Sequence, residues 1–90
     1  IGDGAFYHCK SLPKIEIPNS VKTIGADAFY DCESLPEIEI PNSVKTFGSG
    51  AFTRCKSLQE IRIDNTEEYV KQNWSKRWND DCNAKITYLR

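Results

Sequence analysis

Apolar residues recur along most of the chain in blocks of equal length. In the first block these residues are Ile1, Ala5, Phe6, Cys9, Leu12, Ile15, Ile17 and Val21. Residues 1–23 and residues 24–46 are identical at 18 of 23 positions, and residues 47–63 keep the register with 10 matches in 17. Self-similarity with a period between about 20 and 50 residues is the signature of a repeat architecture. We therefore predict stacked units at 1–23 and 24–46, followed by a partial unit at 47–63.

Each unit contains one short segment in which apolar and polar residues alternate. In the first unit Glu16 separates Ile15 from Ile17, and such alternation predicts a strand with one buried face. Pro13 and Pro18 flank the segment, at positions where we expect a missing N–H to do least harm. The Pro-Asn-Ser sequence that follows predicts a turn.

A second segment, Gly-x-x-Ala-Phe-x-x-Cys, precedes each predicted strand. Phe6 and Cys9 stand three residues apart, which places them on one face of a short helical turn. Each coil is thus predicted to contain a strand, a turn and a helical turn. A single unit buries too little apolar surface to offset the entropy of ordering its backbone, so the units must stack.

Differences between the first two units are confined to positions that we predict to face outward. They are Asp3/Ala26, Gly4/Asp27, His8/Asp31, Lys10/Glu33 and Lys14/Glu37. Stacking would align Lys10, Glu33 and Lys56 into a column of alternating sign, and it would set Asp31 beside Arg54. Pairs of this kind contribute roughly 0.2–1 kcal/mol each.

The unit Ile-Gly-x-x-Ala-Phe-x-x-Cys-x-x-Leu-x-x-Ile-x-Ile-Pro closely resembles the BspA-like (Treponema-type) leucine-rich repeat, over residues 1–63. The resemblance implies an α/β fold, a right-handed leucine-rich-repeat solenoid with short parallel strands. It also implies a bacterial protein at the cell surface or secreted, similar to adhesins that bind host or microbial proteins. Because the chain starts inside a unit, we expect further repeats before Ile1 in the parent protein.

Residues 64–90 depart from the repeat and predict a C-terminal cap made of a helix and a strand. A polar residue followed by acids at 64–68 is typical of a helix start. Val70, Trp74 and Trp78 recur at four-residue spacing, a stripe that would cover the open end of the solenoid. The alternative is that the tryptophans stack on a ligand such as a sugar.

A closing strand is predicted at residues 85–89. Its residues Ile86 and Tyr88 would face inward and add a last rung beside Ile61 and Ile63. The N-terminal edge has no equivalent cover, so self-association through that edge is a further expectation.

The chain of 90 residues carries a formal net charge of −1, which gives no broad field for binding nucleic acid. It contains no apolar run of the roughly 18–20 residues that a membrane span needs, so we expect no membrane insertion.

The cysteines do not predict a reactive site. Cys9, Cys32 and Cys55 are separated by whole repeats, so they form no local metal motif. Stacking would bring neighbours to about 5 Å, which leaves a disulfide as an alternative to buried, inert thiols. His8 lies beside Cys9, but the two side chains should point in opposite directions, which argues against a nucleophilic pair. We therefore predict no enzyme activity, no metal and no cofactor, with Cys82 a packing residue of the cap.

The outward face of the strands is the predicted binding surface. It comprises Lys14, Glu16, Glu37, Glu39, Glu60 and Arg62. Four carboxylates between two cations would suit a basic partner, although a solvated strand face is the plain alternative. Tyr7 and Tyr30 form a second candidate, since adjacent exposed aromatics are enriched at interfaces. The alternative is that they are part of the packing on the convex side.

The sequence thus predicts a protein-interaction module, with a host extracellular-matrix or cell-surface protein as a candidate partner. The alternative function is a passive spacer or stalk. A spacer would be indifferent to reversal of Glu37 and Glu39 to lysine, whereas a binding module would lose its partner.

Overall fold

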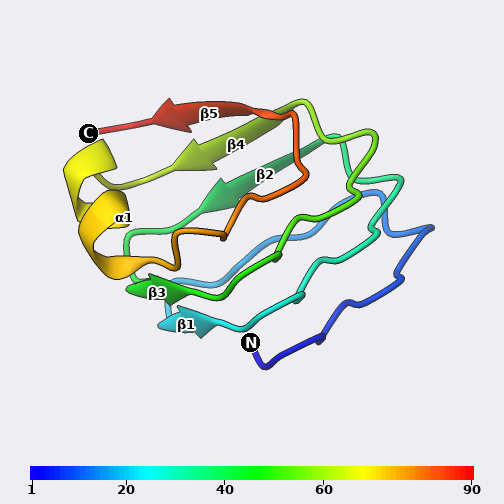
Figure 1. The fold of residues 1–90 in the computed structure, drawn as a ribbon, viewed down its shortest axis with the longest axis horizontal. Coiled ribbons are helices and arrows are strands. Elements are labelled where there is room, and N and C mark those ends of the chain that lie inside the picture. The colour runs from blue at the N-terminus through cyan, green and yellow to red at the C-terminus, as the bar shows by residue number, and fades with distance from the viewer.

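The computed structural model describes residues 1–90, which wind into stacked coils (Figure 1). The coils follow one another from the N-terminus, drawn in blue, to the C-terminus, drawn in red. In chain order the elements are β1 (Thr23–Ile24), β2 (Glu37–Ile40), β3 (Thr46–Phe47), β4 (Glu60–Ile63), α1 (Glu67–Asn73) and β5 (Lys85–Tyr88). All strand pairs are parallel, as the solenoid prediction requires.

The main sheet has the strand order β2-β4-β5. Ile38 is in register with Ile61, and Ile61 with Ile86. Burial alternates along β2 and β4, where the isoleucines are buried and the residues between them are not. The inward direction predicted for the isoleucines of these two strands is therefore confirmed.

A second, two-stranded parallel sheet pairs β1 with β3, and the sequence analysis did not foresee it. Ile24 is in register with Phe47, and both side chains are buried. Backbone hydrogen bonds extend this ladder in both directions. Gly25 donates to Ile1 at 2.9 Å, and Ser75 donates to Phe47 at 3.0 Å.

The predicted helical turns are wrong, because the Ala-Phe-x-x-Cys segments form turns without a helix. In the first coil Tyr7 donates its N–H to Gly4 within the coil, whereas Phe6 donates to Ala28 of the next coil at 2.7 Å. The same alternation of local and inter-coil bonds recurs in the second coil. Every second donor is thus used between coils, so the regular ladder of an α-helix cannot form.

The strand predicted in the first unit is also absent. Residues 14–17 belong to no sheet, and no backbone hydrogen bond joins them to β2. As a result β2 is an edge strand of the main sheet, paired with β4 alone. We call the open junction between residues 14–17 and β2 the first seam.

Two prolines account for the first seam. In the next junction Gln59 donates its N–H to Pro36 at 2.8 Å, and Asp64 donates to Ile40 at 2.9 Å. The residues at these two positions one coil earlier are Pro36 and Pro41, which have no N–H to donate. The prediction that prolines flanking the strand do least harm is therefore wrong, because these positions close both ends of the ladder.

An aromatic column fills the interior. Phe6, Phe29 and Phe52 stack face to face, with centroids 5.4 Å and 5.3 Å apart. Trp78 meets Phe52 edge-on at 6.2 Å. Phe29 and Phe52 are fully buried, while Phe6 is partly buried, so the column is most enclosed in the second and third coils.

Residues 64–90 add a modified fourth coil. Helix α1 begins after Thr66, whose side chain accepts a hydrogen bond from the Tyr69 N–H. It ends at Asn73 with Trp74 as an extended C-cap, so the tryptophans do not form the helical stripe predicted for them. The chain leaves the helix because the next residue, Ser75, joins the β1-β3 ladder.

Candidate protein-interaction surface

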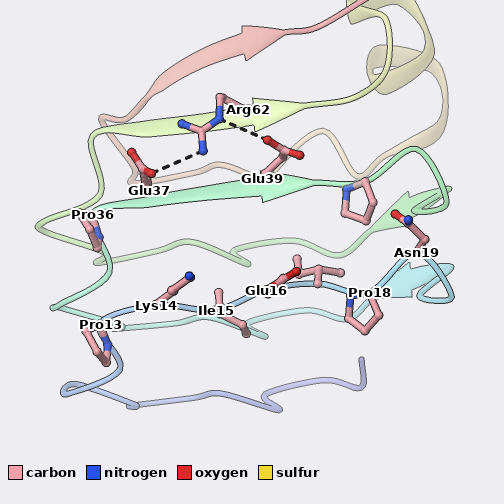
Figure 2. A pocket seen from close by; sticks show the side chains of 12 residues that line it. Pro13, Lys14, Ile15, Glu16, Pro18, Asn19, Pro36, Glu37, Glu39 and Arg62 are labelled. Atoms are coloured by element: carbon pink, nitrogen blue, oxygen red, sulfur yellow. Dashed lines mark ion pairs between the residues drawn. The ribbon is translucent and has the colours of Figure 1, made fainter.

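The outward face of the main sheet carries an acidic cluster that is organised by one arginine. Arg62 on β4 reaches Glu60 at 3.0 Å and both Glu37 and Glu39 on β2 at 3.5 Å. Figure 2 shows its guanidinium between the two β2 carboxylates. Alternation along two neighbouring strands places these four side chains on one face. We call them the acidic cluster.

Glu60 is held from two sides. The Thr87 hydroxyl donates to its Oε2 at 2.8 Å, and Arg62 donates to its Oε1 at 3.0 Å. The Thr87 hydrogen bond, followed by that of Arg62, lowers the pKa of Glu60. The hydrogen bonds that Arg62 donates to Glu60 and Glu37 raise the pKa of Arg62, so Glu60 and Arg62 are both ionised at neutral pH. Thr87 was missed in the sequence, because only the pairing of β5 with β4 brings it here.

The exposed part of the acidic cluster is negative. The side chains of Glu37 and Glu39 are each 61% exposed, whereas that of Arg62 is only 29% exposed. Three carboxylates surround one cation, which leaves an excess of two negative charges. Arg62 thus lies close to Glu37 and Glu39 without covering them.

Lys14 and Glu16 do not join the acidic cluster. They belong to the unpaired segment across the first seam (Figure 2), and neither makes an ion pair. The six predicted binding residues are therefore divided into a connected set on β2 and β4 and a separate pair on the first coil. The first seam is what separates them.

A groove of about 720 Å³ lies along the first seam. Its lining includes Ile15 and Ile17 from the first coil and Glu37 and Glu39 from β2. All four prolines of the chain also line it, namely Pro13, Pro18, Pro36 and Pro41. Figure 2 shows Pro13 and Pro36 at one end of the groove. We call this hollow the seam groove.

The Ala-Phe-x-x-Cys side of the solenoid carries a second charged cluster, centred on Asp31. Asp31 was predicted to face outward, but its side chain is only 4% exposed. His8 Nδ1 lies 2.7 Å from its Oδ2, Lys10 lies 3.9 Å away, and Arg54 lies 4.0 Å from its Oδ1. The pairing predicted between Asp31 and Arg54 is confirmed. The outward direction is wrong, because side chains from the first and third coils close over the carboxylate.

Two opposing effects set the ionisation of Asp31. Burial raises the pKa of this carboxyl, but the hydrogen bond to His8 and the charges of Lys10 and Arg54 lower it further, so its pKa lies below the ordinary value of 3.8. Asp31 is therefore an anion at neutral pH. Its carboxylate contacts His8 and Lys10 of the first coil and Arg54 of the third, so the cluster links three successive coils.

Tyr7 and Tyr30 stack beside this cluster with centroids 4.7 Å apart. Tyr7 is 46% exposed, and the His8 ring meets it edge-on. The pair is therefore partly accessible, but it also packs the His8 side chain against Asp31. The packing interpretation is therefore supported, while a binding role for the pair stays a prediction.

The four cysteines are free thiols. Cys32 donates its Sγ–H to the Phe6 carbonyl oxygen at 3.3 Å, and Cys55 donates to Phe29 at 3.1 Å. Burial raises the pKa of Cys32 to about 11 and that of Cys55 to about 12. Thiols with such pKa values are poor nucleophiles near neutral pH. No group of three or more His, Cys, Asp or Glu side chains is placed to hold a metal ion.

A smaller hollow lies near α1, lined in part by Trp74, Trp78 and Tyr88. Trp74 is 4% exposed and Trp78 is 6% exposed, and both pack against Phe47. Neither ring presents a free face, so they do not offer the stacking platform that a sugar site requires. The helix itself has seven residues, and no helix here has the length and apolarity to cross a membrane.

Comparison with known proteins agrees with the coiled architecture. The sequence model of the family described as "BspA type Leucine rich repeat region (6 copies)" matches residues 1–79. The match continues past Ile63, where the repeat pattern of the sequence gives way, and into the fourth coil.

Among solved structures, the crystal structure of a leucine-rich-repeat protein from Treponema pallidum is similar, with a TM-score of 0.68 and 47% sequence identity. The alignment covers 69% of this chain and 29% of that protein, so the chain spans less than a third of its relative's length. No curated protein sequence matches the chain significantly. Leucine-rich repeats are generally a non-enzymatic fold that binds proteins. On the match over residues 1–79, this chain belongs to the BspA-type leucine-rich-repeat family.

Proposed function

We propose that the chain is a protein-binding module of a larger adhesin-like protein at the bacterial cell surface or in the secreted fraction. Its repeats present the acidic cluster to a basic surface of a host or microbial protein. Repeats of the BspA type are typical of surface and secreted bacterial proteins, which favours this setting. Stacked repeats generally use their extended sheet face for binding.

The proposal rests on the exposure of Glu37 and Glu39 and on their distance to Arg62. Both carboxylates are exposed, yet both lie 3.5 Å from a half-buried arginine on the next strand. A side chain held in place before binding loses little conformational entropy when a partner engages it. The cluster is therefore better suited to recognition than a set of freely moving surface acids.

The test is a pull-down from extracellular-matrix and cell-surface extracts, with the wild type beside the double variant E37K/E39K. We expect a partner that is retained by the wild type, released by salt and lost in the variant, because a reversed charge repels a basic surface. The matched control is E67K/E68K, which makes the same charge change in the exposed first turn of α1. Thermal unfolding followed by circular dichroism checks that each variant folds.

Two outcomes would contradict the proposal. Equal loss of the partner in E67K/E68K would show that net charge matters and the sheet face does not. Absence of any salt-sensitive partner, over a range of calcium and salt concentrations, would favour a passive spacer.

A further inference from the structure

We propose that the seam groove binds an arginine side chain of the protein partner, with its guanidinium between Glu16 of the first coil and Glu39 of β2. The proposal rests on the proposed function and specifies which group of the basic partner is recognised. It also gives a part in binding to Glu16, which lies outside the acidic cluster.

The charges across the two sheet-side junctions are the first observation behind it. Glu39 is in register with Arg62 on β4, whose Nε lies 3.5 Å from the Glu39 Oε1. The residue one repeat before Glu39 is Glu16, and both line the seam groove. The second junction therefore sets opposite charges in neighbouring coils, whereas the first sets two carboxylates. Like charges at opposite positions are unfavourable, and a cation between them would relieve the repulsion.

The chain supplies no cation of its own at this place. Lys14 lines the same groove, but neither Lys14 nor Glu16 makes an ion pair, and Glu39 pairs with Arg62 alone. The charged residues of the lining are two cations, Lys14 and Arg62, and three carboxylates, Glu16, Glu37 and Glu39. Their sum is one negative charge, so a single arginine would neutralise the groove.

The second junction shows how these carboxylates hold a guanidinium. Arg62 approaches Glu37 through Nη2 and Glu39 through Nε, each at 3.5 Å (Figure 2). A guanidinium is planar and can engage two carboxylates at once, whereas an ammonium is a compact and strongly hydrated charge. The Glu39 side chain remains 61% exposed, which leaves it accessible to a second guanidinium from the groove. Arginine is therefore the favoured group.

The seam groove also suits the rest of an arginine side chain. Its volume of about 720 Å³ lies within the roughly 300–1,000 Å³ typical of ligand sites. Ile15 and the four prolines supply apolar lining, on which the carbon stem of an arginine can lie while its charged end stays at the carboxylates. The contact is made by side chains, so it needs no free backbone group of β2.

The experiment is a nuclear magnetic resonance titration of the isotope-labelled chain with N-acetyl-arginine N-methylamide. The citrulline compound keeps the shape of arginine without its charge, and the lysine compound keeps the charge without the planar group. We expect the arginine compound to give saturable shifts in the amides of residues 14–17 and β2. Binding should weaken by about tenfold or more for citrulline and by about threefold or more for lysine.

Protein variants test the position of the guanidinium. E16Q removes one of the two carboxylates and should weaken the arginine compound by about fivefold or more. E16R places a guanidinium opposite Glu39 from within the chain, as Arg62 does in the next junction, and should abolish binding. The matched control is E68R, because Glu68 is exposed in the first turn of α1 and lies outside the groove. It should bind like the wild type, and thermal unfolding checks that each variant folds.

The outcomes separate this proposal from the function on which it rests. If E37K/E39K loses the pull-down partner while E16Q and E16R bind the arginine compound like the wild type, the acidic cluster acts without the groove, and only the present proposal falls. Equal binding of the citrulline or lysine compound would overturn the assignment to arginine. Equal loss in E16R and E68R would overturn the site, because net charge alone would then explain the binding.

Discussion

The first and second junctions between coils are alike on one side of the solenoid and different on the other. On the Ala-Phe-x-x-Cys side, Phe6 donates to Ala28 at 2.7 Å and Phe29 donates to Ala51 at 2.8 Å. On the sheet side, β2 and β4 are fully paired, whereas residues 14–17 are not paired with β2. Units that are almost identical in sequence therefore need not make identical junctions.

The difference arises because the bonds that close the two ends of the sheet ladder take their donors from the later coil and their acceptors from the earlier one. The acceptors of the first coil are intact, but the donors of the second coil are replaced by Pro36 and Pro41. The first two units carry prolines at the same positions, so a comparison between them does not reveal that two N–H donors are missing. Only the third unit, with Gln59 and Asp64, shows what the ladder needs.

Truncation of the aromatic column should have the largest effect. Phe29 is fully buried between two stacked rings, so F29A should lower the free energy of unfolding by about 3–5 kcal/mol. F6A touches the first junction alone and starts from a partly exposed ring, so its loss should stay below about 3 kcal/mol. Urea denaturation measures both. Equal losses would contradict the view that the first coil is the more loosely held.

Acid should weaken both junctions through Asp31, which contacts His8 in the first coil and Arg54 in the third. Its pKa is lower in the folded protein than the ordinary 3.8, so its stabilising effect is present above pH about 4 and is lost as the pH falls through the folded value. We expect D31N to be less stable than the wild type at pH 7, by less than F29A, and the two stabilities to converge toward pH 2. Thermal unfolding across this range measures it, and a constant difference would contradict the assignment.

The buried cysteines test whether both junctions stay closed. Cys32 bonds across the first and Cys55 across the second, with pKa values raised by burial to about 11 and about 12. At pH 8 we expect both thiols to be alkylated at least about tenfold more slowly than the same thiols in the urea-unfolded chain, because the thiolate is the reactive form. Mass spectrometry of labelled peptides measures the rates. A rate for Cys32 close to that of the unfolded chain would mean that the first junction opens readily.

The same thiols predict a loss of stability in alkali. Because their pKa values rise on folding from the ordinary 9.0, their contribution is complete below pH about 9. It is lost as the pH rises toward 11 and 12, since the unfolded chain releases its protons first.

Much of the fold could be predicted because period and alternation are local properties of a sequence. The 23-residue repeat located β2 and β4, and alternation set Ile38 and Ile61 inward. The failures share a cause, since each depends on a neighbouring coil. Asp31 is buried by side chains from the coils on both sides of it, and no pattern within its own unit reports that.

The sequence predicted the acidic cluster only in part. Its four members share a strand face, which alternation predicts, but their arrangement around Arg62 depends on the register of β2 and β4. The separation of Lys14 and Glu16 from it depends on two absent N–H groups. The sequence alone shows that Gln59 and Asp64 replace Pro36 and Pro41 in the third unit. Only the structure shows that the N–H groups of Gln59 and Asp64 bond to the preceding coil.

The smallest expected effect on global stability belongs to P36Q/P41D. Two new backbone hydrogen bonds would contribute about 0.5–1.5 kcal/mol each, while the loss of two prolines frees the unfolded chain and costs about 0.4–1 kcal/mol each. The net change should therefore lie within about 2 kcal/mol of zero. P13Q/P18D bears the same entropic loss without gaining bonds, so the difference between the two double variants isolates the missing ladder.

Amide hydrogen exchange should detect new pairing of β2 even where the global free energy of unfolding changes little. In P36Q/P41D we expect amide hydrogen exchange along β2 to slow by about tenfold or more, because edge groups become paired, while P13Q/P18D leaves it unchanged. Slower exchange in both variants would trace the effect to the loss of proline itself. Unchanged exchange in both would mean that something other than the two missing N–H groups holds the first seam open, and the contrast between the junctions would need a cause in the packing of the first coil.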